Sequence, residues 1–251
     1  MRAGVRRGSI PHIPMRIALA LIATALAIPH GLSSPIRLVV AGDSTASNWP
    51  ASGVRRGWGQ FIQPYFNADD VRVINHAVSG CSTKTFLSLG FWRKVLNEKP
   101  DFVLIQFGHN DSHGPKKPES TNAGTDFKDY LRRFVDETRA AGATPVLVTP
   151  MFRRRFGPDG KLIDGLLPYV TAMKEVAAER KVALVDLHTA SGALFERLGP
   201  KESAALGDSA DDATHFNEKG ARAMADLVMN GLLKAEPSLK NCLAADNLAT
   251  K

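Results

Sequence analysis

Residues 36–44 read Ile-Arg-Leu-Val-Val-Ala-Gly-Asp-Ser, an apolar run of β-forming residues (36–41) that stops at a Gly-Asp-Ser turn. Four further β-type runs also end in small, polar or turn-forming residues, and they span 71–77, 102–107, 145–149 and 182–187. Between them lie amphipathic stretches with helical spacing, at 58–66, 86–96, 125–140 and 167–180, and a last one spans 217–234. Apolar strands that alternate with helices are typical of a parallel sheet covered on both faces. The pattern predicts a doubly wound α/β fold, with a five-stranded parallel sheet in three α/β/α layers.

The composition fits one globular domain. The chain has 251 residues, 44% of them hydrophobic and 23% charged, so its core needs no disulfide framework or structural metal. Its formal net charge is +7, but residues 1–27 hold four arginines and no acid. The remainder has 28 Lys and Arg against 25 Asp and Glu, which is too even for a polyanion-binding patch. We therefore expect no nucleic-acid partner. Separately, we expect a monomer. Whether Cys81 and Cys242 pair is left open.

The first residues have the pattern of an export signal. A basic stretch precedes an apolar run of twelve residues, 17–28, and the run contains the small-residue pattern Ala25-Leu26-Ala27. A membrane span needs about 20 apolar residues, so a transmembrane anchor is the weaker alternative. We predict a secretory signal peptide at 1–27, one domain at 35–240 and a tail at 241–251. The expected location is secreted or periplasmic, without stable membrane association.

Ser44 follows the first predicted strand, at the sheet edge where α/β proteins bind ligands. A serine nucleophile needs a base and a carboxylate that orients the base. Asp212 and His215 are three residues apart, the spacing of neighbours on one helical turn. Asp211 could replace Asp212, although we favour Asp212. Each residue also has an ordinary explanation as a turn or capping residue, and only the combination indicates acyl transfer.

Acyl transfer also requires hydrogen-bond donors for the oxyanion that forms on the carbonyl oxygen. The Ser44 N–H is one candidate. The others are the N–H of Gly80, after the second strand, and the side-chain amide of Asn110, after the third. Taken singly, Gly80 and Asn110 could be ordinary turn residues.

In this order, Gly42-Asp43-Ser44, Gly80, Gly108-His109-Asn110-Asp111 and Asp212-x-x-His215 resemble the four blocks of the SGNH, or GDSL-type, hydrolase superfamily. Further motifs make the chain similar to the rhamnogalacturonan acetylesterases: Gly42-Asp43-Ser44-Thr45, Gly57-Trp58-Gly59, Asn75-x-Ala77-x-x-Gly80, Gln106-Phe107-Gly108-His109-Asn110-Asp111 and Val148-Thr149-Pro150. The resemblance implies an SGNH, flavodoxin-like fold. It also implies that Ser44 is the nucleophile, His215 the base and Asp212 its orienting carboxylate. Ser44 N–H, Gly80 N–H and the Asn110 amide would form the oxyanion hole.

Four residues near the predicted strand ends are candidates for substrate contact: Trp49, His109, Arg153 and Arg154. Arginine clusters are usually solvated, yet guanidinium groups suit the carboxylates of a pectic chain. Trp49 lies in a loop just after Ser44 and could line the cleft. His109 and His113 have the spacing of a zinc-binding pair but lack the glutamate between them. We expect no metal and no cofactor.

The function expected from these features is that of an exported serine esterase. It would remove acetyl groups from a plant cell-wall polysaccharide, with rhamnogalacturonan as the expected polymer, through an acetyl-serine intermediate. The partner would be an acetylated polysaccharide or oligosaccharide. One alternative is the same machinery acting on lipids or thioesters, as in a lysophospholipase. Another is a non-catalytic carbohydrate-binding protein that keeps the fold.

Overall fold

Five parallel strands form one sheet in the order β2-β1-β3-β4-β5. The computed structural model describes residues 1, 4 and 34–245, and residues 34–245 belong to one compact unit. The strands span Ile36–Gly42 (β1), Val71–Asn75 (β2), Phe102–Gln106 (β3), Thr144–Val148 (β4) and Ala183–Val185 (β5). The predicted α/β fold is confirmed, and the ends of the five strands differ from the prediction by no more than two residues.

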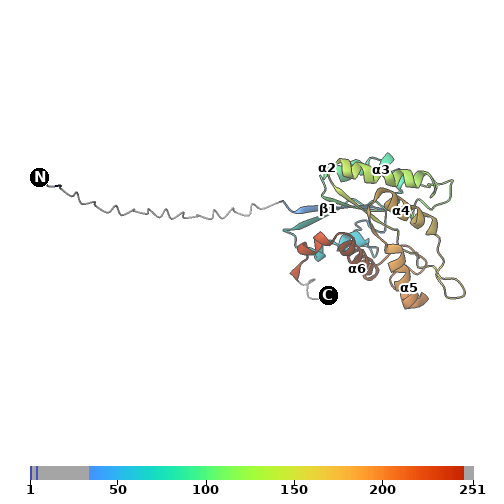
Figure 1. Ribbon diagram of the computed structural model, residues 1–251. Helices are drawn as coiled ribbons and strands as arrows, with labels where there is room; N and C mark the ends of the chain where they lie inside the picture. The colour runs from blue at the N-terminus through green and yellow to red at the C-terminus, as the bar shows by residue number, and fades with distance from the viewer. Residues whose placement is uncertain (2–3, 5–33, 246–251) are drawn as a thin grey trace. The chain divides into compact units, whose positions relative to one another are not determined.

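Helices cover both faces of the sheet (Figure 1). The α-helices span Thr83–Ser88 (α1), Phe91–Asn97 (α2), Asp126–Ala140 (α3), Leu167–Arg180 (α4), Leu187–Ala204 (α5) and Glu218–Ala235 (α6). Three short 3₁₀ helices span Trp58–Phe61 (η1), Gln63–Tyr65 (η2) and Pro237–Cys242 (η3). Figure 1 shows α2 and α3 on one side of the sheet and α5 and α6 on the other.

Successive residues of β1 point into two separate cores, as the period of a strand requires. Leu38 and Val40 pack in the core that contains residues of α5 and α6. Val39 and Ala41 pack in the core that contains residues of α1 to α4. All four side chains have no exposed surface. An apolar run without alternation is therefore explained by burial on both faces.

The strand order makes the carboxyl end of β1 the point where the sheet changes direction. β2 lies on one side of β1 and β3 on the other, so the chain goes from β1 to β2 and then crosses back past β1 to β3. Ligands of open α/β sheets bind at such a point. The residues that follow β1, β2 and β3, including Ser44, Gly80 and Asn110, are therefore brought to one edge of the sheet.

The helices differ from the prediction in three places. The stretch 86–96 forms two helices because Gly90, with φ 77°, separates them. The stretch 58–66 forms η1 and η2 instead of an α-helix, with Pro64 inside η2. Helix α5 was not predicted, because it contains small residues and a break at Gly199, which has φ 72° and precedes Pro200. Its beginning is capped by Asp186, whose side chain accepts a hydrogen bond from the Thr189 N–H.

The packed part of the chain extends beyond the predicted boundary at residue 240. Leu243 pairs with Phe66, and the Ala244 N–H donates to the Tyr65 carbonyl at 3.0 Å. Cys81 and Cys242 are both free thiols, so they do not pair with each other. The expected signal peptide, apart from residues 1 and 4, lies outside the described residues.

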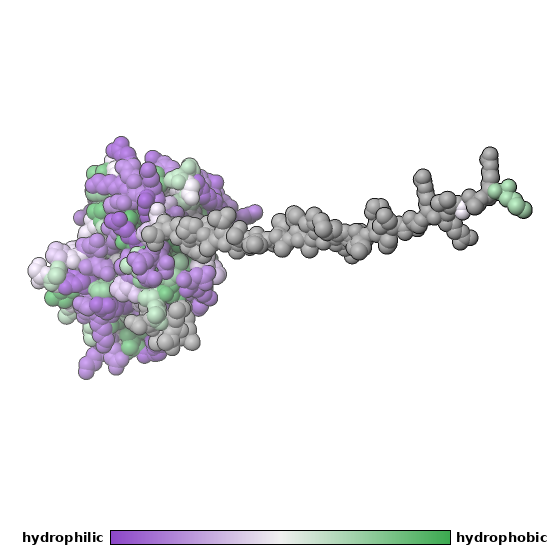
Figure 2. Space-filling view, turned by 90° about the vertical axis from the view of Figure 1, so that its left-hand side faces the viewer, coloured by the Kyte–Doolittle hydropathy of each residue, from purple (hydrophilic) through white to green (hydrophobic). Residues whose placement is uncertain are grey.

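Hydrophilic side chains cover most of the face in Figure 2, with smaller apolar areas between them. Within residues 34–245, the apolar side chains of large size that are exposed are few: Val54, Leu89, Ile163 and Leu167. Among the described helices, none is both long enough and apolar enough to cross a membrane.

Candidate active site

Ser44 lies in a tight turn at the end of β1 that glycines make possible. A side chain at Gly42 would approach the Gln106 carbonyl oxygen to 2.9 Å, and one at Gly57 would approach the Ser47 carbonyl oxygen to 2.3 Å. The turn is closed by the Asp43 carbonyl, which accepts from the N–H of Ser47 at 3.1 Å. The Gly57-Trp58-Gly59 motif thus packs directly against the turn that presents Ser44.

Ser44 and His215, 171 residues apart in sequence, are in hydrogen-bonding contact. Ser44 Oγ lies 2.8 Å from His215 Nε2, and His215 Nδ1 lies 2.7 Å from Asp212 Oδ2. The other carboxylate oxygen, Asp212 Oδ1, accepts from the N–H groups of Thr214 at 2.7 Å and of His215 at 2.9 Å. The predicted convergence of hydroxyl, imidazole and carboxylate is therefore present. Asp212, and not Asp211, is the carboxylate that contacts the ring.

The surroundings of Asp212 favour its ionised form. Burial by itself would raise the pKa of this carboxyl, but hydrogen bonds from the His215 N–H, the His215 ring and the Thr214 N–H lower the pKa to about 2. Because this value lies below the ordinary 3.8, the carboxylate stabilises the fold above about pH 4, and that contribution is lost as the pH falls through 2. Asp212 is thus ready to hold the Nδ1–H of the imidazole at neutral pH.

A buried polar network lies behind the nucleophile. The Asp43 carboxylate, which has no exposed surface, accepts from the Thr45 N–H at 2.9 Å and from the Gln106 amide at 3.1 Å, and His109 Nδ1 lies 3.3 Å away. Burial would raise the pKa of Asp43, but the nearby His109 ring and the Thr45 donors lower it. His109 Nε2 lies 3.1 Å from the Met151 carbonyl oxygen. The network joins the ends of β1, β3 and β4.

His109 is therefore not placed to contact substrate, contrary to the prediction. The residue is only 3% exposed, and both ring nitrogens face groups inside the protein. A residue that follows a strand can point back into the fold, and sequence position alone does not fix that direction.

Arg154 was also predicted to contact substrate, and the structure instead buries its side chain. It is 7% exposed, and its Nη2 donates to the carbonyl oxygens of Asp212 and His215, each at 2.7 Å. Its guanidinium carbon lies 4.4 Å from the ring centre of Phe216, and Nε and Nη1 are enclosed. Burial lowers the pKa of Arg154 to about 10. Arg154 thus holds the loop that carries the carboxylate and the imidazole.

The three predicted oxyanion donors follow neighbouring strands, with Ser44 after the middle one. Gly80 has φ 78°, and nothing lies within 4 Å of where its Cβ would be. Within residues 34–245, the N–H groups of Ser44 and Gly80 donate to no other protein group. The Asn110 amide donates to the Cys81 carbonyl at 2.8 Å, which brings it beside Gly80 and leaves a second N–H for a ligand.

The neighbouring residue Asp111 fixes the loop that carries Asn110 through buried hydrogen bonds. Its buried carboxylate accepts from Thr83 Oγ1 at 2.5 Å, the Gly108 N–H at 3.1 Å and Thr121 Oγ1 at 3.1 Å. Burial raises the pKa of Asp111 to about 7, although the hydrogen bonds from Thr83 oppose the rise. The sequence placed Asp111 in a motif but gave it no role. The structure makes it the support of the loop that carries Asn110.

An open cleft of about 900 Å³ lies beside Asp212. Arg153, Arg154 and Arg155 line one part of it, although the guanidinium of Arg154 is buried, and Ser112 and His113 line another. Arg153 is partly buried and donates to the His109 carbonyl and to Ser112 Oγ, both at 3.1 Å. Arg155 is exposed. The cleft can therefore offer guanidinium groups to an anionic ligand.

Trp49 lies beside the triad. Its Nε1–H donates to the Ser44 carbonyl at 2.9 Å, and its ring meets the His215 ring edge-on, with centres 6.4 Å apart. Arg55, which the sequence did not mark, lies over the Trp49 ring at 5.1 Å and contacts both Asp208 and Asp212. Its Nη2 lies 3.3 Å from Asp212 Oδ2. No local pattern could have found this contact, because it joins residues more than 150 positions apart.

Asp208, Asp212 and His215 offer atoms within 4.8 Å of one another, a spacing that suits a cation. The cationic group that contacts both carboxylates is the Arg55 guanidinium, so we do not assign these residues as metal ligands.

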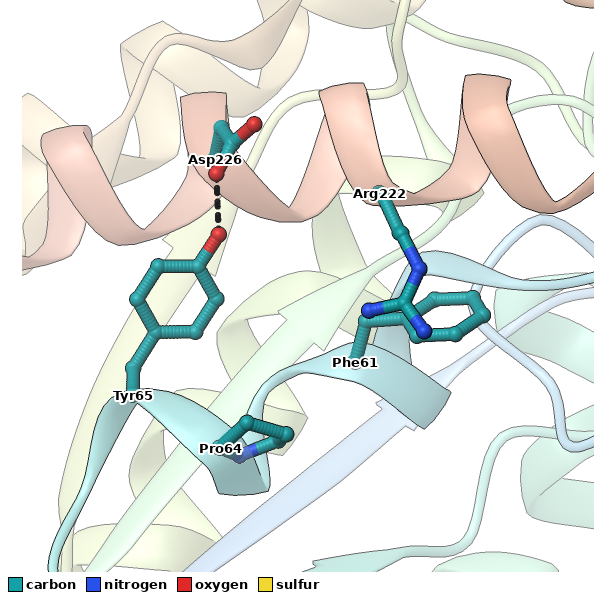
Figure 3. Close-up of a pocket in the computed structure, with 5 residues that line it drawn as sticks. All are labelled: Phe61, Pro64, Tyr65, Arg222 and Asp226. Atoms are coloured by element: carbon teal, nitrogen blue, oxygen red, sulfur yellow. Dashed lines mark hydrogen bonds between the residues drawn. The ribbon is translucent and has the colours of Figure 1, made fainter. Parts of the chain in front are cut away.

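A smaller hollow of about 300 Å³ lies elsewhere, between η1, η2 and α6 (Figure 3). The Tyr65 hydroxyl is hydrogen-bonded to Asp226, and the Arg222 guanidinium carbon lies 4.2 Å from the centre of the Phe61 ring. Figure 3 shows these side chains turned toward one another across the hollow. Its lining holds no serine or histidine that could act as a nucleophile or base.

Comparison with known proteins agrees with this geometry. Residues 40–223 match the GDSL-like lipase/acylhydrolase family. The chain is 37% identical to the rhamnogalacturonan acetylesterase RhgT of Bacillus subtilis over 229 residues, which cover 85% of this chain and 97% of RhgT. It is 36% identical to the probable rhamnogalacturonan acetylesterase YesY of the same organism, over 78% of this chain and 91% of YesY.

Two solved structures show the same fold. The YxiM protein of Bacillus subtilis matches with a TM-score of 0.72 at 29% identity, and the match covers 80% of this chain and 57% of that longer chain. Axe2, an acetylxylan esterase from Geobacillus stearothermophilus, matches with a TM-score of 0.61 at 21% identity, over 81% of this chain and 95% of Axe2.

Proposed function

The chain belongs to the GDSL-like lipase/acylhydrolase family and is a hydrolase of the carbohydrate acetylesterase type, and from this premise we propose that it deacetylates a pectic polysaccharide of the rhamnogalacturonan class. The observation that carries the proposal is the continuous contact from Ser44 through His215 to Asp212. The choice of polymer is supported by two relatives that are at least 36% identical to the chain. One is named a rhamnogalacturonan acetylesterase and the other a probable one.

The proposed reaction proceeds in two steps. Ser44 Oγ attacks the carbonyl carbon of the acetyl ester while His215 Nε2 takes the hydroxyl proton. The tetrahedral intermediate collapses, the C–O bond to the sugar breaks, and the sugar oxygen leaves with the proton from His215. Water then attacks the acetyl-serine, giving up a proton to His215, and acetate leaves as Ser44 regains its proton. Asp212 keeps the ring oriented and stabilises its charged form throughout.

The oxyanion of each tetrahedral intermediate is bound by the donors that the protein leaves open. These are the N–H groups of Ser44 and Gly80 and the second amide N–H of Asn110. Donors fixed in advance stabilise developing charge without having to reorganise during the reaction. The support of Asn110 by Cys81 and by the loop around Asp111 supplies that rigidity.

The cleft beside Asp212 supports an anionic polymer as the substrate. Arg153 and Arg155 line it, and a rhamnogalacturonan backbone presents a galacturonate carboxylate in each repeat. Trp49, at the edge of the His215 ring, provides an apolar surface for a sugar face. We place the acetylated sugar between Trp49 and this cleft.

Export to the periplasm or the medium is part of the proposal. The basic stretch and the apolar run of twelve residues at 17–28 support it. A polymer of the plant cell wall is met only outside the cell, which fits the same location.

Acetate release from defined substrates tests the function. With 4-nitrophenyl esters of two to ten carbons, we expect kcat/KM to be highest for acetate and to fall steeply as the acyl chain grows. With polymers, we expect faster release from acetylated rhamnogalacturonan than from acetylated xylan. A preference for acyl chains of eight or more carbons would instead indicate a lipid esterase.

The variant Arg153→Gln sharpens the polymer comparison. If the arginines bind carboxylates, the variant should have a higher KM for acetylated rhamnogalacturonan and an unchanged KM for acetylated xylan and for 4-nitrophenyl acetate. Equal effects on the two polymers would argue against carboxylate recognition in this cleft.

The variant Asn110→Ala tests the oxyanion hole. We expect kcat for 4-nitrophenyl acetate to fall by about 10²–10³, with KM changed little, because the lost donor acts on the transition state. Asn67→Ala, at an exposed position before β2, is the matched control and should keep the full rate. A decrease of less than threefold in the Asn110 variant would remove its amide from the oxyanion hole.

A further inference from the structure

Arg55 connects the loop after the nucleophile to the loop that carries Asp212 and His215. Its Nε donates to Asp208 and its Nη2 lies 3.3 Å from Asp212 Oδ2, the same oxygen that faces His215 Nδ1. The Asp208 side chain is 6% exposed and that of Arg55 is 34% exposed. One guanidinium therefore contacts two carboxylates, and one of these contacts the base.

The position of Arg55 is fixed on other sides as well. Its guanidinium lies over the Trp49 ring at 5.1 Å, and Trp49 is held by the Ser44 carbonyl. The next residue, Arg56, donates its N–H to the Phe216 carbonyl at 2.8 Å. The two loops are thus joined through the backbone as well as through the side chain, which leaves the guanidinium little freedom to move.

Several charged groups face the imidazole from the segments packed against it. Asp212 belongs to its own loop, and Asp208, earlier in that loop, lies within 4.8 Å of the other two residues. The Arg55 guanidinium comes from the loop after β1. Arg154, from the segment after β4, contacts the carbonyl oxygens of Asp212 and His215.

Two carboxylates this close to an imidazole would favour its protonated form, and a protonated ring cannot accept the Ser44 proton. Asp212 is needed to orient the ring, but its negative charge and that of Asp208 both lie beside the same imidazole. A cation between the two carboxylates offsets their field without removing the hydrogen bond from Asp212.

We propose that Arg55 is a positioning residue that keeps His215 available as a base by balancing the charges of Asp208 and Asp212. This inference rests on the proposed esterase function. It assigns to Arg55 no contact with the substrate: the residue acts through Asp212, and its charge sets the pH range over which the esterase works.

The pH dependence of kcat/KM for 4-nitrophenyl acetate tests the proposal, because this neutral ester needs no carboxylate recognition. In Arg55→Gln, the acid limb of the profile should move up by about 0.5–1 pH unit, the size expected for a partly exposed charge near the ring. In Asp208→Asn it should move down, because a negative charge is lost. In Arg55→Lys it should stay close to the wild type, because the charge is retained.

The remaining controls separate charge from structure. Arg72→Gln removes an exposed arginine near the amino end of β2, and it should leave the profile unchanged. The shift in Arg55→Gln should shrink in 0.5 M NaCl, because salt screens exposed charges. Melting temperatures of all variants report on folding.

An acid limb that stays in place in Arg55→Gln, or one that moves in the same direction in Arg55→Gln and Asp208→Asn, overturns the proposal. A lower rate with an unchanged limb in Arg55→Gln would indicate a purely structural contact and also overturns it. The activity of Ser44→Ala separates the role of Arg55 from the esterase function on which it rests. An inactive Ser44 variant together with an unshifted Arg55 variant refutes the role of Arg55 alone, whereas an active Ser44 variant refutes the esterase function.

Discussion

Ser44→Ala is expected to lower kcat/KM for 4-nitrophenyl acetate by roughly 10⁵ or more, the scale seen when a serine nucleophile is removed. The hydroxyl is the only group of the side chain that reacts, and it lies 2.8 Å from the His215 nitrogen that takes its proton. The substitution leaves the Ser44 N–H in place, so the oxyanion donors remain and a small residual rate is expected.

The fold should tolerate this change. Ser44 is 5% exposed and its hydroxyl contacts His215, so the substitution removes one hydrogen bond and creates no large cavity. We expect a melting temperature within a few degrees of the wild type. Ser88→Ala, at the exposed carboxyl end of α1, is the matched control and should keep full activity. A Ser44 variant that retains a tenth of the activity would rule out a serine nucleophile at this position.

Asp212→Asn is expected to lower kcat by about 10⁴, through the protonation pattern of the ring rather than through loss of structure. Asp212 Oδ1 accepts two backbone N–H groups, so the carbonyl oxygen of an asparagine would take that place. Its NH₂ group would then face His215 Nδ1. Since this group donates, Nδ1 must accept, the ring proton moves to Nε2, and Nε2 can no longer take the proton of Ser44.

The neighbouring carboxylate provides the control. Asp211→Asn changes the same charge one residue earlier but does not alter the contact with the ring, so kcat should stay within about threefold of the wild type. Because the pKa of Asp212 is lowered to about 2, the native carboxylate is ionised across the whole assay range. A result in which Asp211→Asn is the more damaging change would reassign the carboxylate of the triad.

The sequence was sufficient to predict the sheet and the contact between Ser44 and His215. Strands buried on both faces leave unbroken apolar runs, and the turn after β1 needs glycines at fixed positions, such as Gly42. Both signals are local, so they can be read along the chain. The family resemblance linked Asp212-x-x-His215 to Ser44, a pairing that spacing alone does not determine.

The direction of side chains and the contacts between distant loops were not predictable in this way. His109 and Arg154 follow strands as expected, but they turn inward to the carbonyl oxygens of Met151, Asp212 and His215. Arg55 lies in the loop between Ser44 and Trp58, and no local sequence pattern singles it out there. Helix α5 was missed because its small residues and its glycine break hide the helical period.

The separation of 171 residues between nucleophile and base has a consequence for folding studies. Strand β1, which leads to Ser44, and the loop between α5 and α6 must both be in place before the proton can be transferred, so a fragment that lacks either has no complete triad. The loop-closure entropy of such distant contacts is lost before the contacts themselves stabilise the fold. Hydrolysis of a chromogenic acetate can therefore serve as a reporter of the fully assembled chain, which spectroscopic signals from α-helices alone cannot provide.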